Sequence, residues 1–284
     1  MRVDNEIRKF LVSVLKEDTG RIDITTETIF DRDFPVTAHL MTKQNCILAG
    51  IPFFKKTFLI VDRSIKFSNC LSDGAEVKQG SVVCELKGML KSILKAERVA
   101  LNIISHLSGI ATYTNEFVRQ TDGKFKVLDT RKTLPGLRKL EKYAVRVGGG
   151  YNHRMNLSEM ILIKDNHINL WSKYNNLTRI DSISYLVSKA KKRSKTTIEV
   201  EVESFEEALV ATKAGADILM FDNADISEIK KFLDYCGKNR PLIEVSGGLD
   251  IKDIKKLKEL DIDFVSVGKI THSAPSIDFS LEIV

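Results

Sequence analysis

The chain has 284 residues, of which 43% are apolar and 29% are charged, and its formal net charge is +6. This length suits one large domain or two modest ones, and the composition is that of an ordinary soluble globular protein. Aromatic residues make up only 7%, which argues against large stacking surfaces for nucleic acid. The positive charge has two interpretations: a solvated, lysine-rich surface or a basic pocket for anions.

The cysteines and the N-terminal stretch bear on where the protein works. Cys46, Cys70, Cys84 and Cys236 form no C-x-x-C pair, and their spread suits reduced thiols better than a disulfide framework. The first 18 residues are charged throughout and lack the apolar core of a signal peptide. No apolar run approaches the ~18 residues that span a membrane. We therefore expect a cytoplasmic protein that binds neither a membrane nor nucleic acid.

The first third of the chain predicts a small α+β domain. Residues 5–17 have the spacing of an amphipathic helix, with an apolar face formed by Ile7, Phe10, Leu11, Val14 and Leu15. Short strands are predicted at 36–41, 45–49, 65–68 and 82–86, and turn residues separate them. A long helix is expected over roughly 89–119, broken near Ser108-Gly109.

The rest of the chain alternates between short apolar strands and amphipathic helices. The predicted strands are 125–129, 160–164, 197–202, 217–222, 242–246 and 263–268. The predicted helices between them are 136–147, 178–193, 205–214, 226–236 and 251–260. This alternation indicates a parallel sheet covered by helices, and six units favour an α/β barrel over a doubly wound sheet, which remains the alternative.

Polar or glycine residues follow nearly every predicted strand. In a parallel barrel these strand ends meet at one mouth, where barrel enzymes place their active sites. Turns and helix caps also need polar residues, but that need does not explain several cations and two acids at the ends of apolar strands.

Basic residues are densest between positions 129 and 167. Arg131, Lys132, Arg154 and Lys164 lie at strand ends or in loops, whereas Lys139 and Lys142 are expected to face solvent on a helix. Arginine suits bidentate capture of carboxylate or phosphate, and lysine acts as a point charge. The cluster therefore fits a ligand with several negative charges.

Three glycines, 148–150, precede His153 and Arg154. The glycine run is either a flexible turn or a close approach of backbone to ligand. His153 is either a tautomer-fixed donor to substrate, which its neighbours favour, or a satisfied core histidine. His39 and His106 are interpreted as structural, and His167 is left ambiguous.

Carboxylates and glycine turns end the later strands. Glu199, Glu201 and Glu203 alternate with valines, so all three share one strand face. Glu201 and Asp222 make a plausible magnesium site with substrate phosphates; the alternative is ion pairing with Lys132 and Lys164. The turns at 246–248 and 268–272 offer backbone N–H groups for a phosphate cradle.

Several segments together resemble the quinolinate phosphoribosyltransferase family, also named nicotinate-nucleotide pyrophosphorylase (carboxylating). They are DTRKTLPGLRKLEKYAVRVGGGYNHR, LIKDNHI, EVEVES, MFDN, EVSGGL and SVGKITHSAP. The resemblance covers nearly the whole chain, and three N-terminal segments share it: EDTGRIDITTE, CILAGIPF and AERVALNIISHLSGIAT. Leu134, Val147 and Ile22 depart from the family's usual residues, and none of these changes removes a charge.

The resemblance implies an N-terminal α+β sandwich over 1–110, with the tail 273–284 packing back on it, and an incomplete α/β barrel over 111–272. It implies a homodimer or a hexamer of dimers, with active sites shared between subunits. The implied reaction joins quinolinate to phosphoribosyl pyrophosphate. It yields nicotinate mononucleotide, pyrophosphate and CO2 for NAD synthesis, with Mg²⁺ as cofactor.

The resemblance also assigns roles to residues. Lys132, Glu201 and Asp222 are the expected catalytic residues, and the last two are also the expected metal ligands. The expected substrate-binding residues are Arg98 from the partner subunit, Thr130, Arg131, His153, Arg154, Lys164, Ser246, Gly247, Gly248, Gly268 and His272.

The same residues leave two alternative functions. A related protein associated with molybdate transport shares the DTRK and GGG-x-x-HR motifs, but that branch tends to lose the KDNH and THSAP patterns that stand here. A basic nucleic-acid-binding protein is suggested only by the pI near 9.0. It would need a basic face with exposed aromatic residues, and the chain has one Trp and no such cluster.

Overall fold

The computed structural model describes residues 4–284 and divides into two compact units. The first comprises the described residues up to 115 together with 134–149 and 273–284, and the second comprises 116–133 and 150–272. Residues 134–149, which the sequence placed in the barrel, thus belong to the first unit. The hydrogen bonds that hold them there include Glu141 to His106 at 2.9 Å and Tyr143 to Asp73 at 2.5 Å.

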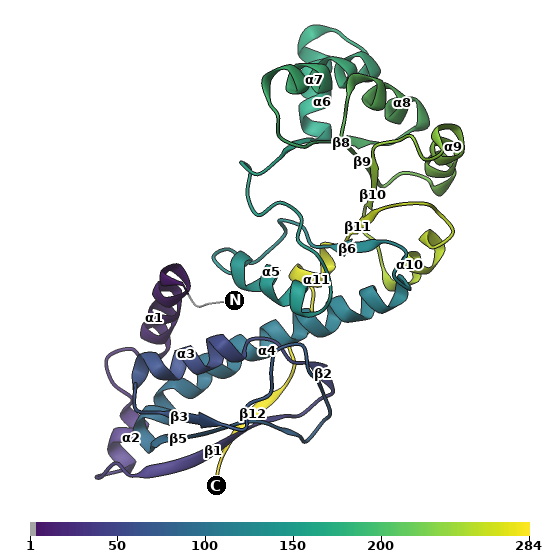
Figure 1. Cartoon of the computed structure of the whole chain (residues 1–284). Helices are drawn as coiled ribbons and strands as arrows, with labels where there is room; N and C mark the ends of the chain where they lie inside the picture. Colours follow the sequence, from purple (N-terminus) through teal and green to yellow (C-terminus); the bar gives the residue numbers. More distant parts are fainter. Residues whose placement is uncertain (1–3) are drawn as a thin grey trace. The chain divides into compact units, whose positions relative to one another are not determined.

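The first unit combines an antiparallel sheet with helices (Figure 1). Its strands are β1 (Pro35–Thr42), β2 (Cys46–Ile47), β3 (Lys66–Ser68), β4 (Glu76–Val77), β5 (Val82–Met89) and β12 (Phe279–Ile283). Its helices are α1 (Asn5–Thr19), α2 (Ile24–Ile29), α3 (Ile51–Val61), α5 (Arg138–Val147) and most of α4 (Leu90–Gln120).

The sheet of the first unit has the strand order β12-β1-β5-β3, and β2 pairs separately with β4. One face of the sheet packs on α3 and α4, and the buried side chains between them include Leu40, Phe54, Phe58, Leu86 and Ile104. The C-terminal strand pairs antiparallel with β1, with Leu40 opposite Leu281. This two-layer arrangement is the expected α+β sandwich.

Helix α4 is continuous, so the break expected near Ser108-Gly109 is wrong. The Ser108 hydroxyl accepts a hydrogen bond from Ala49 N and donates one to Ala49 O, at 3.0 and 3.1 Å. A Cβ at Gly109 would collide with Pro275 O and lie 3.1 Å from Ser276 Cα. Both residues are small because other backbone segments approach the helix there, and neither interrupts it.

Helix α5 is buried along its middle, which corrects the expectation that Lys142 faces solvent. Glu141 and Lys142 have no exposed surface, and Tyr143 is 9% exposed. Lys139 does reach the surface, where it pairs with Asp4 and with Glu6. Three consecutive buried positions mean that the helix is covered on more than one side.

The expectation of four reduced thiols is also wrong, because Cys70 and Cys84 form a disulfide. Cys84 lies in β5, and Cys70 follows β3, the strand that pairs with β5. This pairing brings the two sulfur atoms together although 14 residues separate them in sequence. Cys46 and Cys236 are free.

The second unit alternates strands with helices, as expected (Figure 1). Its strands are β6 (Lys126–Leu128), β7 (Ile161–Ile163), β8 (Ile198–Val202), β9 (Ile218–Asp222), β10 (Leu242–Ser246) and β11 (Phe264–Ser266). Its helices are α6 (Asp165–Asn175), α7 (Arg179–Arg193), α8 (Phe205–Ala214), α9 (Ile226–Cys236), α10 (Ile251–Leu257) and α11 (Lys269–His272).

The six strands form one parallel sheet in the order β6-β11-β10-β9-β8-β7. Beyond β6 the chain adds only an isolated parallel bridge between Leu128 and Tyr151, and in the described part of the chain no ladder joins β6 to β7. The sheet is therefore an incomplete barrel, which confirms the expected fold class. Because all strands are parallel, their carboxyl ends lie at one edge of the sheet. No helix of the described residues is long and apolar enough to cross a membrane.

Candidate active site

A cavity of about 350 Å³ opens where the carboxyl ends of the barrel strands meet. It brings together nine of the residues predicted from sequence: Thr130, Arg131, Lys132, His153, Arg154, Lys164, Glu201, Asp222 and Ser246. Three unpredicted residues complete its lining, namely Leu162, Met220 and Ser266. Cations therefore face carboxylates across one cavity.

The loop after β6 carries Arg131 and Lys132, and hydrogen bonds to both backbone polar groups of Lys132 fix its position. Lys132 N donates to the Thr130 hydroxyl at 3.1 Å, and the Thr271 hydroxyl donates to Lys132 O at 2.7 Å. A Cβ at Gly268 would lie 3.1 Å from Lys132 Cδ and 3.2 Å from His272 Nε2. A glycine at position 268 therefore leaves room for the lysine stem between the ends of β6 and β11.

Arg154 is the most enclosed cation of the cavity, with 9% of its surface exposed. Its Nη1 donates to Met160 O at 3.1 Å. Loss of solvent and the neighbouring Arg131 lower the pKa of Arg154, whereas Glu199 and Glu201 raise it. A guanidinium stays charged at neutral pH, so the Arg154 side chain presents a fixed positive charge that can bind an anion in the cavity.

Lys164 and Glu201 form an ion pair across the cavity wall. The other Glu201 oxygen accepts a hydrogen bond from Asp165 N, at the start of α6, at 2.8 Å. Lys164 N donates to His167 Nδ1 at 2.9 Å, so the ambiguous His167 caps the helix. The alternative of ion pairing at Glu201 is thus realised with Lys164.

The three alternating glutamates share a strand face but lie at three depths. Glu199 is fully buried below the cavity, where its Oε2 lies 2.9 Å from His153 Nε2. Glu201 lines the cavity, and Glu203 lies beyond the strand end, where it is exposed and pairs with Arg179. Only the middle carboxylate of the three is placed to meet a ligand.

Asp222 is the second carboxylate of the cavity wall and lies at the end of β9. Asn223, with φ +53°, donates to it at 3.4 Å, and a Cβ at Gly247 would lie 2.5 Å from Asn223 N. Gly247 is therefore required where the turns after β9 and β10 touch. Oxygen donors of this kind fit Mg²⁺, which is usually held by one or two carboxylates together with substrate phosphates. Asp222 and Glu201 are the residues that would hold it, and at Glu201 the ion would compete with Lys164.

Five predicted residues lie outside the cavity lining. Gly247, Gly248, Gly268 and His272 follow β10 and β11, at the same edge of the sheet as the cavity. Arg98 is exposed on α4 in the first unit. Its predicted role depends on a second subunit and remains a prediction.

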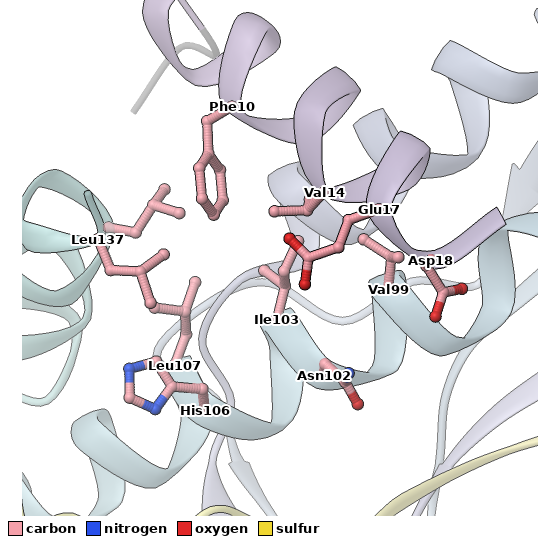
Figure 2. A pocket seen from close by; sticks show the side chains of 11 residues that line it. Phe10, Val14, Glu17, Asp18, Val99, Asn102, Ile103, His106, Leu107 and Leu137 are labelled. Carbon is pink, nitrogen blue, oxygen red and sulfur yellow. The ribbon is translucent and has the colours of Figure 1, made fainter. Parts of the chain in front are cut away.

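A second cavity, of about 440 Å³, lies within the first unit between α1 and α4 (Figure 2). Apolar side chains such as Phe10, Val14 and Ile103 line it, and its charged residues Glu17 and Asp18 are acidic. An apolar, acidic cavity does not suit a polyanionic ligand. Among the described residues that line this second cavity, none was predicted from the sequence to bind substrate. The cavity at the strand ends of the second unit is therefore the candidate active site.

Comparison with known proteins identifies the family. The family model for the quinolinate phosphoribosyl transferase C-terminal domain matches residues 110–282, and the model for the N-terminal domain matches residues 23–108. The chain belongs to the quinolinate phosphoribosyl transferase family.

Members of this family from distant organisms align over nearly the whole chain. A probable nicotinate-nucleotide pyrophosphorylase [carboxylating] of Bacillus subtilis (strain 168) is 38% identical over 98% of this chain and 93% of its own length. A mitochondrial quinolinate phosphoribosyltransferase [decarboxylating] of Nicotiana tabacum is 32% identical over 98% of this chain and 82% of its own. The crystal structure of NadC from Streptococcus pyogenes has a TM-score of 0.90 at 40% identity, covering 98% of this chain and 96% of that one.

The layer of side chains beneath the cavity mouth was not predicted from the sequence. Leu162, Met220 and Ser266 each stand two residues before a predicted site residue, at 164, 222 and 268. Side chains two residues apart on a strand share a face, so this period could have revealed them. Glu244, two residues before Ser246, was not predicted either. Its Oε2 lies 3.7 Å from His153 Nε2.

Proposed function

We propose that this chain is a quinolinate phosphoribosyltransferase. It joins quinolinate to phosphoribosyl pyrophosphate and releases nicotinate mononucleotide, pyrophosphate and CO2, a step of NAD biosynthesis. The observation that carries the proposal is the convergence of four cations and two carboxylates on one cavity at the carboxyl edge of the barrel. Family membership supports the same reaction.

The cations form the seat for quinolinate, a pyridine with two adjacent carboxylates. The side chains of Arg131, Arg154 and Lys164 supply opposite charges to the carboxylates, while Leu162 and Met220 offer apolar surface to the ring. Guanidinium groups suit bidentate contact with carboxylate. This arrangement orients the ring so that its nitrogen meets the ribose carbon.

Phosphoribosyl pyrophosphate occupies the opposite side, where the turns after β10 and β11 present their backbone. Ser246, Gly247, Gly248, Gly268 and His272 hold its phosphates, and Lys132 lies between the two ligands. Backbone N–H groups of glycine-rich turns are suited to phosphate. Glu201 and Asp222 stabilise positive charge on the ribose carbon as pyrophosphate departs.

Magnesium at Asp222 and Glu201 would neutralise the leaving pyrophosphate. Holding two polyanions in register supplies most of the catalysis, and proximity of this kind contributes about 7–11 kcal/mol. Once the ring nitrogen is quaternised, its positive charge stabilises the electron pair that departing CO2 leaves on the adjacent ring carbon, and a proton from solvent then takes the place of CO2. Loss of CO2 therefore needs no further cofactor.

We also propose that the active sites are shared between subunits of a homodimer, or of a hexamer of dimers, with Arg98 reaching the quinolinate seat of a second copy. The exposure of Arg98 on the first unit supports this assignment. Mixing the two inactive variants Arg98→Ala and Lys132→Ala should restore about a quarter of wild-type activity. About half of the dimers would then be hybrids, and each hybrid would contain one intact site of two. If mixing restores no activity, the sites are not shared.

We place the reaction in the cytoplasm, because both substrates are multiply charged and cross membranes poorly without a carrier. Cell fractionation followed by immunoblotting tests this location. Recovery of the protein outside the cytoplasmic fraction would contradict it.

A single assay tests the reaction itself. Purified protein, quinolinate, phosphoribosyl pyrophosphate and Mg²⁺ should yield nicotinate mononucleotide, and nicotinate in place of quinolinate should not react. Chelation of the metal should stop turnover but leave quinolinate binding, measured by calorimetry, unchanged. Failure of the complete mixture to form product would refute the proposed function.

A further inference from the structure

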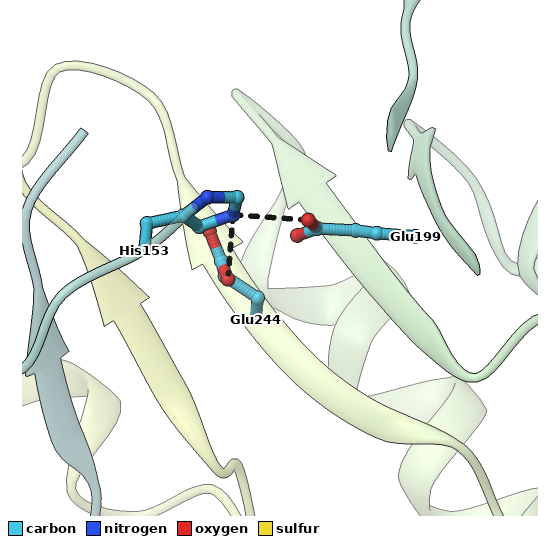
Figure 3. A group of neighbouring side chains, drawn as sticks. All are labelled: His153, Glu199 and Glu244. Carbon is cyan, nitrogen blue, oxygen red and sulfur yellow. Dashed lines mark hydrogen bonds and ion pairs between the residues drawn. The ribbon is translucent and has the colours of Figure 1, made fainter. Parts of the chain in front are cut away.

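The ring of His153 has a defined tautomer. Arg154 N–H donates to His153 Nδ1 at 2.8 Å, so Nδ1 carries no proton. A neutral imidazole then carries its proton on Nε2. Nε2 lies 2.9 Å from Glu199 Oε2 and donates to it (Figure 3). Both ring nitrogens are thus engaged within the protein, and the ring lines the cavity without a nitrogen to offer to a carboxylate.

This tautomer also determines whether the three side chains below the cavity hold a metal ion or a proton. The donor atoms of His153, Glu199 and Glu244 lie within 4.8 Å of one another, a spacing that suits a metal ion. A metal on Nε2 would force the proton onto Nδ1, where it would point at the Arg154 N–H. The existing hydrogen bond excludes that arrangement, so a proton occupies the position between the ring and the carboxylates.

Glu244 closes the cluster from β10. Its Oε2 lies 3.7 Å from His153 Nε2, and its Oε1 accepts a hydrogen bond from the Ser266 hydroxyl. Glu199 and Glu244 are both buried, at 0% and 1% exposure, and two buried carboxylates beside one neutral imidazole are costly unless one is protonated. Burial and the neighbouring Glu199 raise the pKa of Glu244 to about 8.

The same cluster determines where the backbone of Arg154 lies. His153 N donates to Asp129 Oδ1 at 2.9 Å, and Arg154 N donates to the ring held by Glu199. At its far end the guanidinium is tied to Met160 O. Misplacing a binding group by about 1 Å can cost roughly 100-fold in rate, so an arginine that must meet a carboxylate needs such anchoring.

We propose that Glu199 and Glu244 are positioning residues that act through His153 to fix Arg154 at the wall of the quinolinate seat. The inference rests on the proposed function and deepens it. It changes the role of His153 from a substrate-binding cation to a neutral link between buried carboxylates and the binding arginine.

Two substitutions of one residue separate positioning from a general structural role. Glu199→Leu removes the acceptor of the Nε2 proton, whereas Glu199→Gln keeps an acceptor oxygen and removes only the charge. Glu199→Leu should raise the quinolinate Kd and KM about 10-fold or more, the lower end of the loss seen when a group that orients a metal-binding residue is removed. Its kcat at saturation should change less than about twofold, and Glu199→Gln should bind within about twofold of wild type.

Glu207 provides the matched control, because it is also buried but bonds Arg179 and the backbone N of Glu203. Glu207→Leu should lower the melting temperature and leave the quinolinate Kd unchanged. Quinolinate binding by calorimetry, steady-state kinetics and the melting temperature are measured for the wild type, Glu199→Leu, Glu199→Gln and Glu207→Leu.

Nitrogen-15 NMR of labelled histidine reports on the link directly. Nδ1 of His153 should be unprotonated and Nε2 protonated, and both should remain so when quinolinate is added. Conversion to imidazolium on adding quinolinate would overturn the inference, as would equal binding losses in the Leu and Gln variants or wild-type binding in both. If wild-type protein itself binds no quinolinate, the proposed function fails, and the tautomer measured without ligand still tests the link.

Discussion

Replacing Arg154 with methionine should weaken quinolinate binding strongly while changing the stability of the fold only a little. A carboxylate held by a guanidinium gains about 1.5–3 kcal/mol per charged hydrogen bond, so losing Arg154 should cost about 3 kcal/mol of binding, roughly 100-fold in Kd. The cost to stability is small, because the hydrogen bond from the Arg154 side chain to Met160 O is offset by the loss of solvent around the guanidinium and by repulsion from Arg131. We expect the melting temperature to shift by less than about 4 °C, which corresponds to about 1 kcal/mol.

Arg240→Met is the matched control and should behave in the opposite way. The Arg240 side chain is 8% exposed and pairs with Asp263 at 2.6 Å and with Asp261 at 3.2 Å, at the amino ends of the strands. Its loss should lower the free energy of unfolding by about 1–2 kcal/mol and leave the quinolinate Kd unchanged. Calorimetry and thermal melting measure both quantities. Wild-type binding in Arg154→Met, or the same pattern in both variants, would refute the reasoning.

Three further substitutions test other parts of the structure. Lys132→Ala should abolish turnover with an unchanged circular dichroism spectrum; near-normal turnover would contradict its place between the two ligands. The pKa of Glu244 is raised from 4.5 to about 8, and an acid with a higher pKa in the folded state costs stability as pH rises through that window. The free energy of unfolding should therefore fall from about pH 5 to pH 9. Glu244→Gln should reduce this slope without abolishing it, because burial also raises the pKa of Glu199 to about 7; an unchanged slope would argue against the assignment. Gly109→Ala should cost roughly 1–3 kcal/mol in chemical denaturation, because its Cβ would collide with Pro275 O, and a neutral result would mean that the tail moves aside at little cost.

The fold was predictable where sequence period and tertiary environment agree. The strands from β8 to β10 and helices α7 to α9 lie within a residue or two of their predicted ranges, because their apolar spacing matches the burial they find. The break at Ser108-Gly109 was wrongly predicted, because a glycine that admits a neighbouring backbone looks the same in sequence as one that ends a helix. Burial of Lys142 and the Cys70–Cys84 pairing depend on contacts between distant segments, which local pattern does not contain.

The charged residues that line the candidate site were predictable from the sequence, whereas the buried residues beneath them were not. Charges at strand ends identified Arg131, Lys132, Lys164, Glu201 and Asp222, all of which line one cavity. The layer beneath carries Glu244, which resembles an ordinary strand residue in sequence. The tautomer of His153 follows from the hydrogen bond that the Arg154 N–H donates to its ring, and local sequence pattern does not contain that contact.

The place of the last strand has a consequence for synthesis of the protein. Strand β1 lies between β5 and β12, so one edge of β1 stays unpaired until residues 279–283 have left the ribosome. The sheet of the first unit is thus completed only after the residues of the second unit have been made. An unpaired strand edge invites association with other chains, so nascent or C-terminally truncated chains should aggregate more readily than the finished protein.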